Sequence, residues 1–372
     1  MNRRPISQVQ QAFPPFRAEH VGSLLRPAPL LDLRQRFTRG EIDKATLAAG
    51  EDRAIEDAVA LQSRVGLRLA TDGEFRRQSY HGYFYGRLGE ISFEAPAETG
   101  TDGRGTQPIA SIRSRIAWKS PIHAADFAFL RSRTKALPKI TIPGPCALHF
   151  RGGDTAVARA YRDMDQFWDD IVAAFQSELR ALGAAGCTYV QIDETAFAKF
   201  ADAQVRAMLQ ARGDDPDALI ERYIAITNRA IQNLPGLHIG MHLCRGNRGG
   251  HWHAEGSYEA VAEKLFNGLE IDFFLLEYDT PRAGDFSALR FVPREKSIVL
   301  GLVSSKMNVL EDKSELRRRI DQASRFVPLE RLAVSPQCGF ASTELGNPIT
   351  PEMQEAKLRL VVELAQDVWG TA

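Results

Sequence analysis

Ser297-Ile-Val-Leu-Gly-Leu-Val303 is a short apolar run with polar residues on both sides. A run of this length without polar alternation is typical of a strand that is buried on both faces, as in a parallel sheet covered by helices. Comparable runs recur along the chain, at residues 139–145, 189–194, 237–244, 272–278 and 331–338. The chain is therefore expected to build a parallel sheet from segments that are far apart in sequence.

Two further segments, 16–23 and 67–75, also have strand character, which brings the expected number of strands to about eight. Helical patterns separate most of them, and these patterns cover residues 44–65, 156–182, 203–233, 258–267, 315–326 and 351–368. Eight strand–helix units predict a TIM (β/α)8 barrel. An open doubly wound sheet is the alternative, but no G-x-G-x-x-G motif follows the first strand.

Two regions do not follow this alternation of strands and helices. Residues 1–15 are polar and contain proline, and we interpret them as an N-terminal arm. Residues 76–137 are rich in Gly, Arg and aromatic residues, with the alternation of a strand at Ile91-Ser-Phe-Glu94. Long insertions in compact domains are usually functional or mobile. We therefore expect a single catalytic domain over residues 1–372, with an inserted β-rich excursion that serves as a lid.

Composition excludes several classes of protein. Apolar residues make up 44% and charged residues 25% of the chain, as in ordinary soluble globular proteins. The 47 basic and 47 acidic residues cancel, so charge gives no reason to expect nucleic acid or a membrane surface as a partner. The four cysteines are too few for a disulfide scaffold. Because no secretory signal is recognisable, we expect a cytoplasmic protein, and the sequence leaves its oligomeric state open, a homo-oligomer included.

Polar groups fit for chemistry end one expected strand after another. They are Gly22-Ser23, Asp72-Gly-Glu74, Asp193-Glu194, His242-x-Cys244, Glu277, Ser304-Ser305 and Gln337-Cys338. In a TIM barrel the carboxyl ends of all eight strands meet at one rim, where active sites are found. These residues are therefore expected to line one cavity, although loops are polar in any case.

His242 and Cys244 lie two residues apart on an expected strand, so that both side chains point to the same face. Taken alone, such a pair is more often a core histidine beside an inert cysteine than a metal site. At the same rim, however, Glu277 offers a carboxylate and Cys338 a second thiolate. Two thiolates, an imidazole and a carboxylate form a ligand set typical of tetrahedral Zn²⁺.

The carboxylates of Glu74 and Asp193 have no basic partner within their own strands. Two acids that face one cavity suit the ammonium group of a ligand, and salt bridges to nearby arginines are the structural alternative. Cys146 and Cys187 lie in contexts that indicate small buried residues. His251 and His253 flank a tryptophan in a glycine-rich loop, where substrate contact or plain solvation is a better interpretation than metal binding.

Six motifs together resemble those of the cobalamin-independent methionine synthase superfamily, in its short bacterial form with a single barrel. The resemblance covers about residues 16–368, and its motifs are His20-Val-Gly-Ser-Leu-Leu-Arg-Pro27, Thr71-Asp-Gly-Glu-Phe75, Gln191-Ile-Asp-Glu194, His242-x-Cys-Arg-Gly-Asn247, Leu276-Glu-Tyr-Asp279 and Ser335-Pro-Gln-Cys-Gly-Phe340.

This resemblance implies an enzyme that uses zinc to activate a thiol and transfers a methyl group to homocysteine, giving methionine. It implies His242, Cys244, Glu277 and Cys338 as the zinc ligands. The Gly22-Ser23 turn, with Ser23, would meet the carboxylate of homocysteine. Glu74 and Asp193 would meet its ammonium group. The partners are then a small-molecule thiol and a methyl donor, which is 5-methyltetrahydrofolate, in its polyglutamate form, or another small molecule.

The chain departs from the full-length members of this family on the donor side. Their Asp-x-His-Ser-type strand end supplies a histidine as general acid, whereas Gly301-Leu-Val-Ser-Ser-Lys-Met307 has no histidine. The tryptophan that stacks on folate also has no clear counterpart, and His149 lies near its place. An amine leaving group needs a proton. We therefore consider His20 as a replacement acid, because it lies close to Ser23.

Three other functions remain open at this point. The same zinc chemistry could alkylate a sulfonate thiol such as coenzyme M with an epoxide, but arginines should then surround the tail of the thiol. A metal-free barrel related to uroporphyrinogen decarboxylase would need a cavity lined with arginine. A non-catalytic scaffold stabilised by zinc would hold a closed site that thiols do not perturb.

Overall fold

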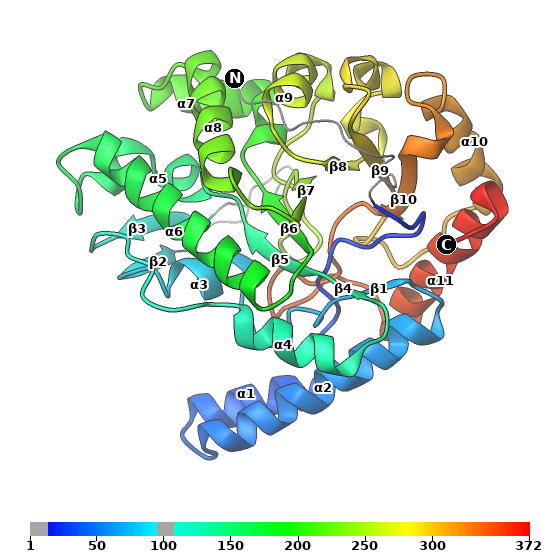
Figure 1. Cartoon of the computed structure of the whole chain (residues 1–372), viewed down its shortest axis with the longest axis horizontal. Coiled ribbons are helices and arrows are strands. Elements are labelled where there is room, and N and C mark those ends of the chain that lie inside the picture. Colours follow the sequence, from blue (N-terminus) through cyan, green and yellow to red (C-terminus); the bar gives the residue numbers. More distant parts are fainter. Residues whose placement is uncertain (1–13, 95–107) are drawn as a thin grey trace.

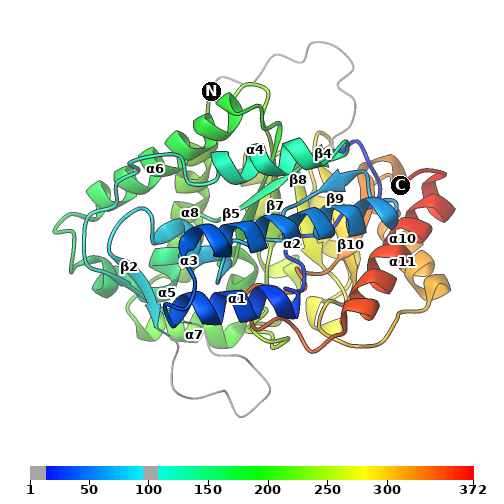
Figure 2. The same cartoon turned by 90° about the horizontal axis from the view of Figure 1, so that it is seen from below.

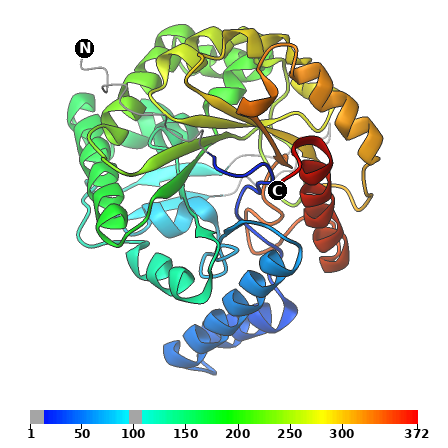
Figure 3. The same cartoon turned by 45° about the vertical axis from the view of Figure 1, so that its right-hand side comes forward.

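Six parallel strands form the central sheet in the order β10-β9-β8-β7-β6-β5, so that each strand lies beside the next one in the chain. The structure, a computed structural model, describes residues 14–94 and 108–372. Figures 1 and 3 show these strands inside the molecule with helices around them. The described strands are β1 (Leu69–Ala70), β2 (Ile91–Glu94), β3 (Ile109–Ile112), β4 (Leu137–Pro138), β5 (Ile140–Pro143), β6 (Tyr189–Glu194), β7 (His238–Leu243), β8 (Phe273–Glu277), β9 (Ser297–Val303) and β10 (Leu332–Pro336).

Helices follow most of the strands, and α1 and α2 lie side by side along one edge of the molecule (Figures 1 and 2). The described α-helices are α1 (Ala28–Thr38), α2 (Lys44–Arg64), α3 (Tyr80–Tyr85), α4 (Ala124–Arg133), α5 (Ala147–Val157), α6 (Met164–Ala184), α7 (Ala203–Ala211), α8 (Pro216–Ile231), α9 (Ala262–Gly268), α10 (Lys313–Ala323) and α11 (Pro351–Trp369). Short 3-10 helices are η1 (Phe197–Ala201), η2 (Tyr258–Ala260), η3 (Pro281–Ala283), η4 (Phe286–Phe291) and η5 (Leu329–Arg331). None of the described helices is long and apolar enough to cross a membrane.

The two edges of the six-stranded sheet are extended in the way a TIM barrel requires. At one edge β1 pairs in parallel with β4, which continues into β5. At the other edge Ala18 bridges Val334 of β10, also in parallel. The Thr71 hydroxyl donates to the Gly22 carbonyl (2.7 Å), which links these two edge segments, although the described residues form no regular ladder between them. Eight parallel positions thus follow in chain order, as predicted.

The register of the strands brings their carboxyl ends to one rim. Asp193 of β6 pairs with His242 of β7, and Glu277 of β8 pairs with Gly301 of β9. Residues 298–303 are buried throughout, as expected for a strand covered on both faces. The rim is therefore the place where the polar strand ends converge.

Some predicted elements differ from the structure. The segment at residues 16–23 contributes only the bridge at Ala18, because its backbone turns away at Gly22, where φ is +141°. The helix predicted at 156–182 begins later, at Met164, where Asp163 caps it, and α5 precedes it. The helix predicted at 203–233 is divided into α7 and α8, since Gly213 adopts a left-handed conformation and Pro216 starts a new helix.

The predicted β-rich excursion is confirmed in the residues that the structure describes. Strands β2 and β3 form an antiparallel pair, and β3 contacts α5. Helices α3 and α4 also belong to this region, and the sequence had not indicated them. Residues 95–107 and residues 1–13 of the predicted arm lie outside the described residues. The lid role therefore stays a prediction.

Candidate metal centre and adjoining cavities

Four side chains from three strand ends converge at the rim. His242 belongs to β7 and Cys244 follows it, Glu277 ends β8, and Cys338 lies two residues beyond β10. One ligand atom from each of them lies within 4.8 Å of those of the other three, and all four residues are buried. The structure thus brings together the four residues that the sequence analysis had selected as metal ligands.

The geometry of this cluster fits a tetrahedral metal ion. The two sulfur atoms lie 3.7 Å apart. A tetrahedral zinc site with Zn–S bonds of about 2.3 Å places its sulfurs about 3.8 Å apart. His242 is 2% exposed, and neither of its ring nitrogens has a hydrogen-bonding partner among the described residues. Because buried polar atoms are rarely left unpaired, this imidazole is suited to a ligand outside the chain.

Neighbouring groups hold the ligands in place. One carboxylate oxygen of Glu277 accepts a hydrogen bond from the backbone N–H of Arg245 (2.9 Å) and lies 3.9 Å from His242 Nε2. The other oxygen lies 3.7 Å from the ammonium group of Lys306, which is also buried. The Cys244 sulfur accepts from the backbone N–H of Gly246 (3.3 Å). Such outer contacts orient ligands and tune a metal site.

The site is electrostatically polarised. The hydrogen bond from Cys338, together with the nearby His242 and Lys306, lowers the pKa of the Cys244 thiol well below its usual range. Burial raises the pKa of Glu277 to about 7, against the opposing effect of Lys306. Burial thus opposes the charge of Glu277, and a bound cation would favour the carboxylate of Glu277 and the thiolate of Cys244.

A narrow cavity of about 30 Å³ adjoins the cluster. Its lining includes three of the metal-ligand candidates and the three predicted substrate-binding residues, namely His242, Cys244, Cys338, Ser23, Glu74 and Asp193. These residues were expected to lie together because they occur at the carboxyl ends of the strands. The structure therefore unites the candidate metal site and the candidate substrate site.

Glu74 and Asp193, the two acids of this cavity, differ in backbone conformation and in hydrogen bonding. Glu74 has φ of +62°, a left-handed conformation that costs a non-glycine residue about 1–2 kcal/mol. One of its carboxylate oxygens accepts from the Thr141 hydroxyl (2.8 Å), and the other is buried without a partner among the described residues. Asp193 accepts from the Gln191 amide (2.6 Å), and burial, reinforced by Glu74, raises its pKa to about 7.

Arginine salt bridges, the structural alternative for these acids, account for Glu74 in part and do not account for Asp193. Arg77 lies 3.8 Å from Glu74, and no lysine or arginine among the described residues lies within 4.0 Å of Asp193. The negative charge of these two buried carboxylates is therefore only partly balanced by nearby basic side chains. A cation from outside the chain would correct this imbalance.

Ser23 faces this cavity next to a glycine that has no room for a side chain. Its hydroxyl oxygen accepts a hydrogen bond from the backbone N–H of Ala341 (3.3 Å). A Cβ atom on Gly339 would lie 2.0 Å from this oxygen. Glycine is therefore required directly after Cys338, so that the last strand end can approach the Ser23 turn.

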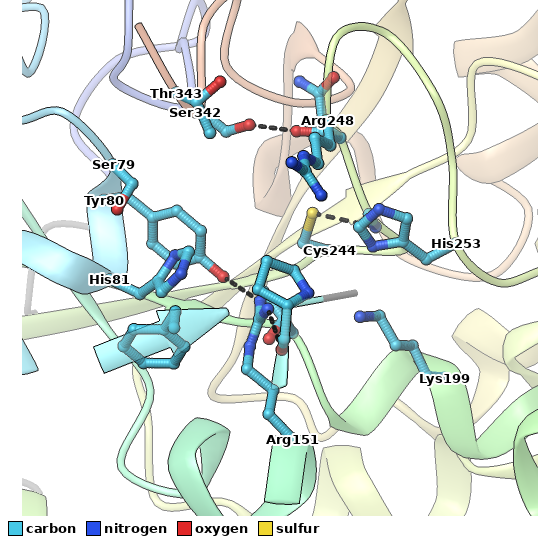
Figure 4. A pocket seen from close by; sticks show the side chains of 15 residues that line it. Ser79, Tyr80, His81, Arg151, Lys199, Cys244, Arg248, His253, Ser342 and Thr343 are labelled. Atoms are coloured by element: carbon cyan, nitrogen blue, oxygen red, sulfur yellow. Dashed lines mark hydrogen bonds between the residues drawn. The ribbon is translucent and has the colours of Figure 1, made fainter. Parts of the chain in front are cut away.

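A second, larger cavity of about 190 Å³ adjoins the narrow one and is also lined by Cys244 (Figure 4). The two cavities share Tyr80, Thr195, Cys244 and Ser342 in their linings. Arg151, Lys199 and Arg248 also line the larger cavity, and Figure 4 shows their charged ends directed toward the space beside Cys244. Cys244 thus borders two cavities, one with acidic residues in its lining and one with basic residues.

His20 does not lie where a proton donor to the substrate would be needed. Its Nε2 is 2.9 Å from the side-chain oxygen of Gln62, and Lys139 donates to its carbonyl group. The described lining of neither cavity includes it. Burial, aided by the charge of Lys139, lowers its pKa to about 3, so the ring is neutral at pH 7. The geometry therefore gives no support to the acid role, which stays a prediction.

We expect the substitution His20→Ala to act on stability more than on chemistry. It removes a buried hydrogen bond to Gln62 and leaves a cavity, which together cost about 2–4 kcal/mol. Activity per folded molecule should fall equally with a donor that needs protonation and with one that does not. Chemical denaturation and donor-specific kinetics measure the two effects. A loss confined to the donor that needs a proton would restore His20 as the acid.

Other candidates from the sequence have structural explanations. Cys146 and Cys187 are buried and unpaired, and burial raises the pKa of both thiols, which confirms that they are small core residues. His149 contacts Tyr223 (2.6 Å) and Asp154 (2.8 Å) and is not among the residues that line either cavity. His253 lines the larger cavity, whereas His251 is exposed at the protein surface.

Four basic residues near the site were missed in the sequence, namely Lys306, Lys199, Arg151 and Arg248, the last of which lies in the glycine-rich loop after Cys244. Lys306 directly follows the strand-end serines that were noted. Lys199 interrupts the apolar run Ala196-Phe-Ala-Lys-Phe200, and such an isolated lysine was a usable signal of a buried charge. Arg151 gave no signal, because its importance depends on how α5 lies beside the excursion.

These features define a class of protein: an α/β barrel with a buried cluster of four candidate metal ligands at the carboxyl ends of its strands. Residues 18–367 match the family model described as the catalytic domain of cobalamin-independent synthase. The chain therefore belongs to the cobalamin-independent methionine synthase family.

Individual relatives agree with this assignment. An uncharacterized protein of Bacillus subtilis, YxjH, is 41% identical over 361 residues, which cover 95% of each chain. A methionine synthase of Pyrococcus abyssi is 23% identical and covers 86% of this chain, with 85% of its own length aligned. A solved structure from Listeria monocytogenes, provisionally described as a vitamin-B12 independent methionine synthase, is 35% identical with a TM-score of 0.74, and the match covers 97% of this chain and 100% of that one. The likeness to this structure confirms the predicted fold class.

Proposed function

We propose that this protein is a zinc-dependent methyltransferase that transfers a methyl group to the thiol of homocysteine and forms methionine. The observation that carries the proposal is the convergence of His242, Cys244, Glu277 and Cys338 beside a cavity that also holds two acids. Membership in the family and the name of the Pyrococcus abyssi relative support it. The four unpaired cysteines are in keeping with the reducing environment of the cytosol.

The ligand set defines what a bound metal would do. When bound, zinc would supply the positive charge that deprotonates a substrate thiol at neutral pH. His242, Cys244, Glu277 and Cys338 would hold it. Glu277 accepts a hydrogen bond from the backbone of Arg245 and lies close to Lys306. These contacts would stabilise its carboxylate if a substrate sulfur replaced it as a ligand.

The narrow cavity would orient the thiol substrate. Glu74 and Asp193 would accept hydrogen bonds from its ammonium group, and Ser23 would meet its carboxylate. The substrate sulfur would then be directed toward Cys244 and Cys338, which line the same cavity. The methyl carbon would have to approach from the larger cavity, because Cys244 borders both. This arrangement suits an in-line displacement between two separately bound molecules.

The alternative thiol, a sulfonate such as coenzyme M, receives less support. Its anionic tail would need arginine in the narrow cavity, where Glu74 and Asp193 stand instead. A polyacidic tetrapyrrole is disfavoured by the same two acids, and the basic cavity of about 190 Å³ is below the roughly 300–1,000 Å³ of sites for larger ligands. A non-catalytic scaffold that holds zinc is distinguished from an enzyme by whether homocysteine changes the coordination of the metal.

Metal content followed by X-ray absorption at the zinc edge tests the proposed function. We expect about one zinc per chain with two sulfur ligands, and a third sulfur ligand when homocysteine is added. Protein purified without zinc that cannot be loaded with it would contradict the proposal. Zinc whose sulfur coordination does not change with homocysteine would indicate a structural site. Glycine betaine, which lacks a thiol, is a suitable control ligand.

A further inference from the structure

The larger cavity has a charge imbalance of its own. Three basic side chains line it, those of Arg151, Lys199 and Arg248, and its described lining contains no carboxylate. Among the residues that the structure describes, none of the three forms a salt bridge with an acid. Cavities that hold charge without a partner usually do so for a ligand of opposite sign.

Of the three basic residues, Lys199 gives the strongest indication of an anionic ligand. It is fully buried in η1, and its ammonium group has no hydrogen-bonding partner among the described residues. Burial and then the charge of Arg151 lower its pKa to about 7, while Cys244 and Glu194 oppose this effect more weakly. A bound anion would restore the charged form of this lysine and satisfy its donors.

The two arginines approach the same space from other elements. Arg151, on α5, is 8% exposed and donates to the Tyr80 hydroxyl (3.0 Å) and the Pro108 carbonyl (3.5 Å), while its Nε has no partner in the described part of the chain. Arg248 follows β7, and Figure 4 shows its guanidinium group directed toward Cys244. Guanidinium groups bind carboxylate and phosphate oxygens in pairs, so this pair of arginines favours such an anion.

The size and walls of the cavity limit the ligand further. Its volume of about 190 Å³ is below the roughly 300–1,000 Å³ of sites for drug-sized ligands. Aromatic rings of Tyr80, His81 and Phe93 form one part of the lining. A small ligand with an apolar or cationic part and one anionic group would match both kinds of wall.

We propose that the methyl donor is a small molecule whose leaving portion carries an anionic group, a carboxylate or a phosphate, held by Arg151, Lys199 and Arg248. This inference rests on the proposed function. In the transfer, the lone pair of the substrate thiolate forms the new sulfur–carbon bond. The bond between the methyl carbon and its carrier atom breaks, and its electron pair stays on the carrier. A sulfonium carrier leaves as a neutral sulfide and needs no proton, in keeping with the position of His20 outside the cavity lining.

Calorimetric titration of the zinc-loaded full chain with inorganic phosphate and with glutarate, a simple carboxylate, tests the anion site. We expect one of the two anions to bind at a single site. The dissociation constant should rise at least about tenfold in Lys199→Met and in Arg248→Gln, since a hydrogen bond to a charged group contributes about 1.5–3 kcal/mol. Binding of phosphate alone identifies a phosphorylated donor, and binding of glutarate alone identifies a carboxylate donor. Arg318→Gln, an exposed position on α10, serves as the control and should bind as the unmodified protein does.

Two results would overturn the inference: no binding of either anion, or unchanged binding in both cavity variants. A pair of methyl donors adds a kinetic readout, since dimethylsulfonioacetate has a carboxylate and trimethylsulfonium does not. The carboxylate donor should have at least about a tenfold higher kcat/KM, and Arg248→Gln should remove this preference. Equal kcat/KM values would contradict the inference while leaving the proposed function intact. If the anions bind but homocysteine does not coordinate the zinc, the proposed function is contradicted, while the anion site itself is supported.

Discussion

Cys244→Ser is expected to abolish methyl transfer to homocysteine, with a loss of at least about 100-fold. Even groups that only orient a metal ligand change affinity or activity by 10–100-fold, and Cys244 belongs to the cluster itself. A serine hydroxyl is a harder ligand that stays protonated at neutral pH, so the softer sulfur contact is lost. Zinc content after dialysis against a chelator, together with initial rates, measures the effect.

Cys146→Ser is the matched control, because Cys146 is also a buried free cysteine but lies outside the cluster. It should retain zinc and activity, with at most a moderate loss of stability. Full activity in Cys244→Ser would rule out the metal centre described here. Equal losses in both variants would indicate a general effect of serine in the core.

Asp193→Asn and Glu74→Gln are expected to raise the KM for homocysteine by about 10- to 150-fold each. This range corresponds to about 1.5–3 kcal/mol for a hydrogen bond to a charged group. Both changes keep the size of the side chain, and Glu74→Gln also keeps the left-handed backbone at this position. Steady-state kinetics with homocysteine and with 4-mercaptobutyrate, which lacks the ammonium group, separate recognition from chemistry.

The thiol without an ammonium group should be used equally well, or better, by the two variants. Glu56→Gln, an exposed position on α2, is the control and should behave as the unmodified protein does. If the variants lost the same factor with both thiols, the acids would have a structural role instead. Their close approach to Thr141 and Gln191 would then be the reason for their presence.

The sequence predicted the parts of the fold that depend on local patterns. Apolar runs such as residues 297–303 marked the buried strands, and Lys44 and Pro351 opened helices where expected. The break between α7 and α8 was missed, although Gly213 and Pro216 carried the signal for it. The first strand was overestimated, because its pairing depends on β10, at the other end of the chain.

The candidate site was predicted to the extent that it lies at strand ends. The rule that carboxyl ends of parallel strands share one rim placed His242, Cys244, Glu277 and Cys338 together, and the structure does so. It could not place His20, whose ring is bound to Gln62 of α2. Nor could it reveal the basic cavity, because residues from α5, η1 and the inserted excursion meet there only through tertiary packing.

Cys244 borders both cavities, so two different sets of structural elements meet at this residue. The metal and thiol side is built from strand ends, whose register fixes every ligand. The other side is built mainly from α3, the β2–β3 pair, α5, η1 and the loop after β7. Under the proposed function, substitutions in these peripheral elements would change the alkyl source that fits without disturbing the four candidate ligands. If the proposed function holds, the acceptor half of the site would be fixed by strand register, and the donor half would depend on the packing of the outer elements.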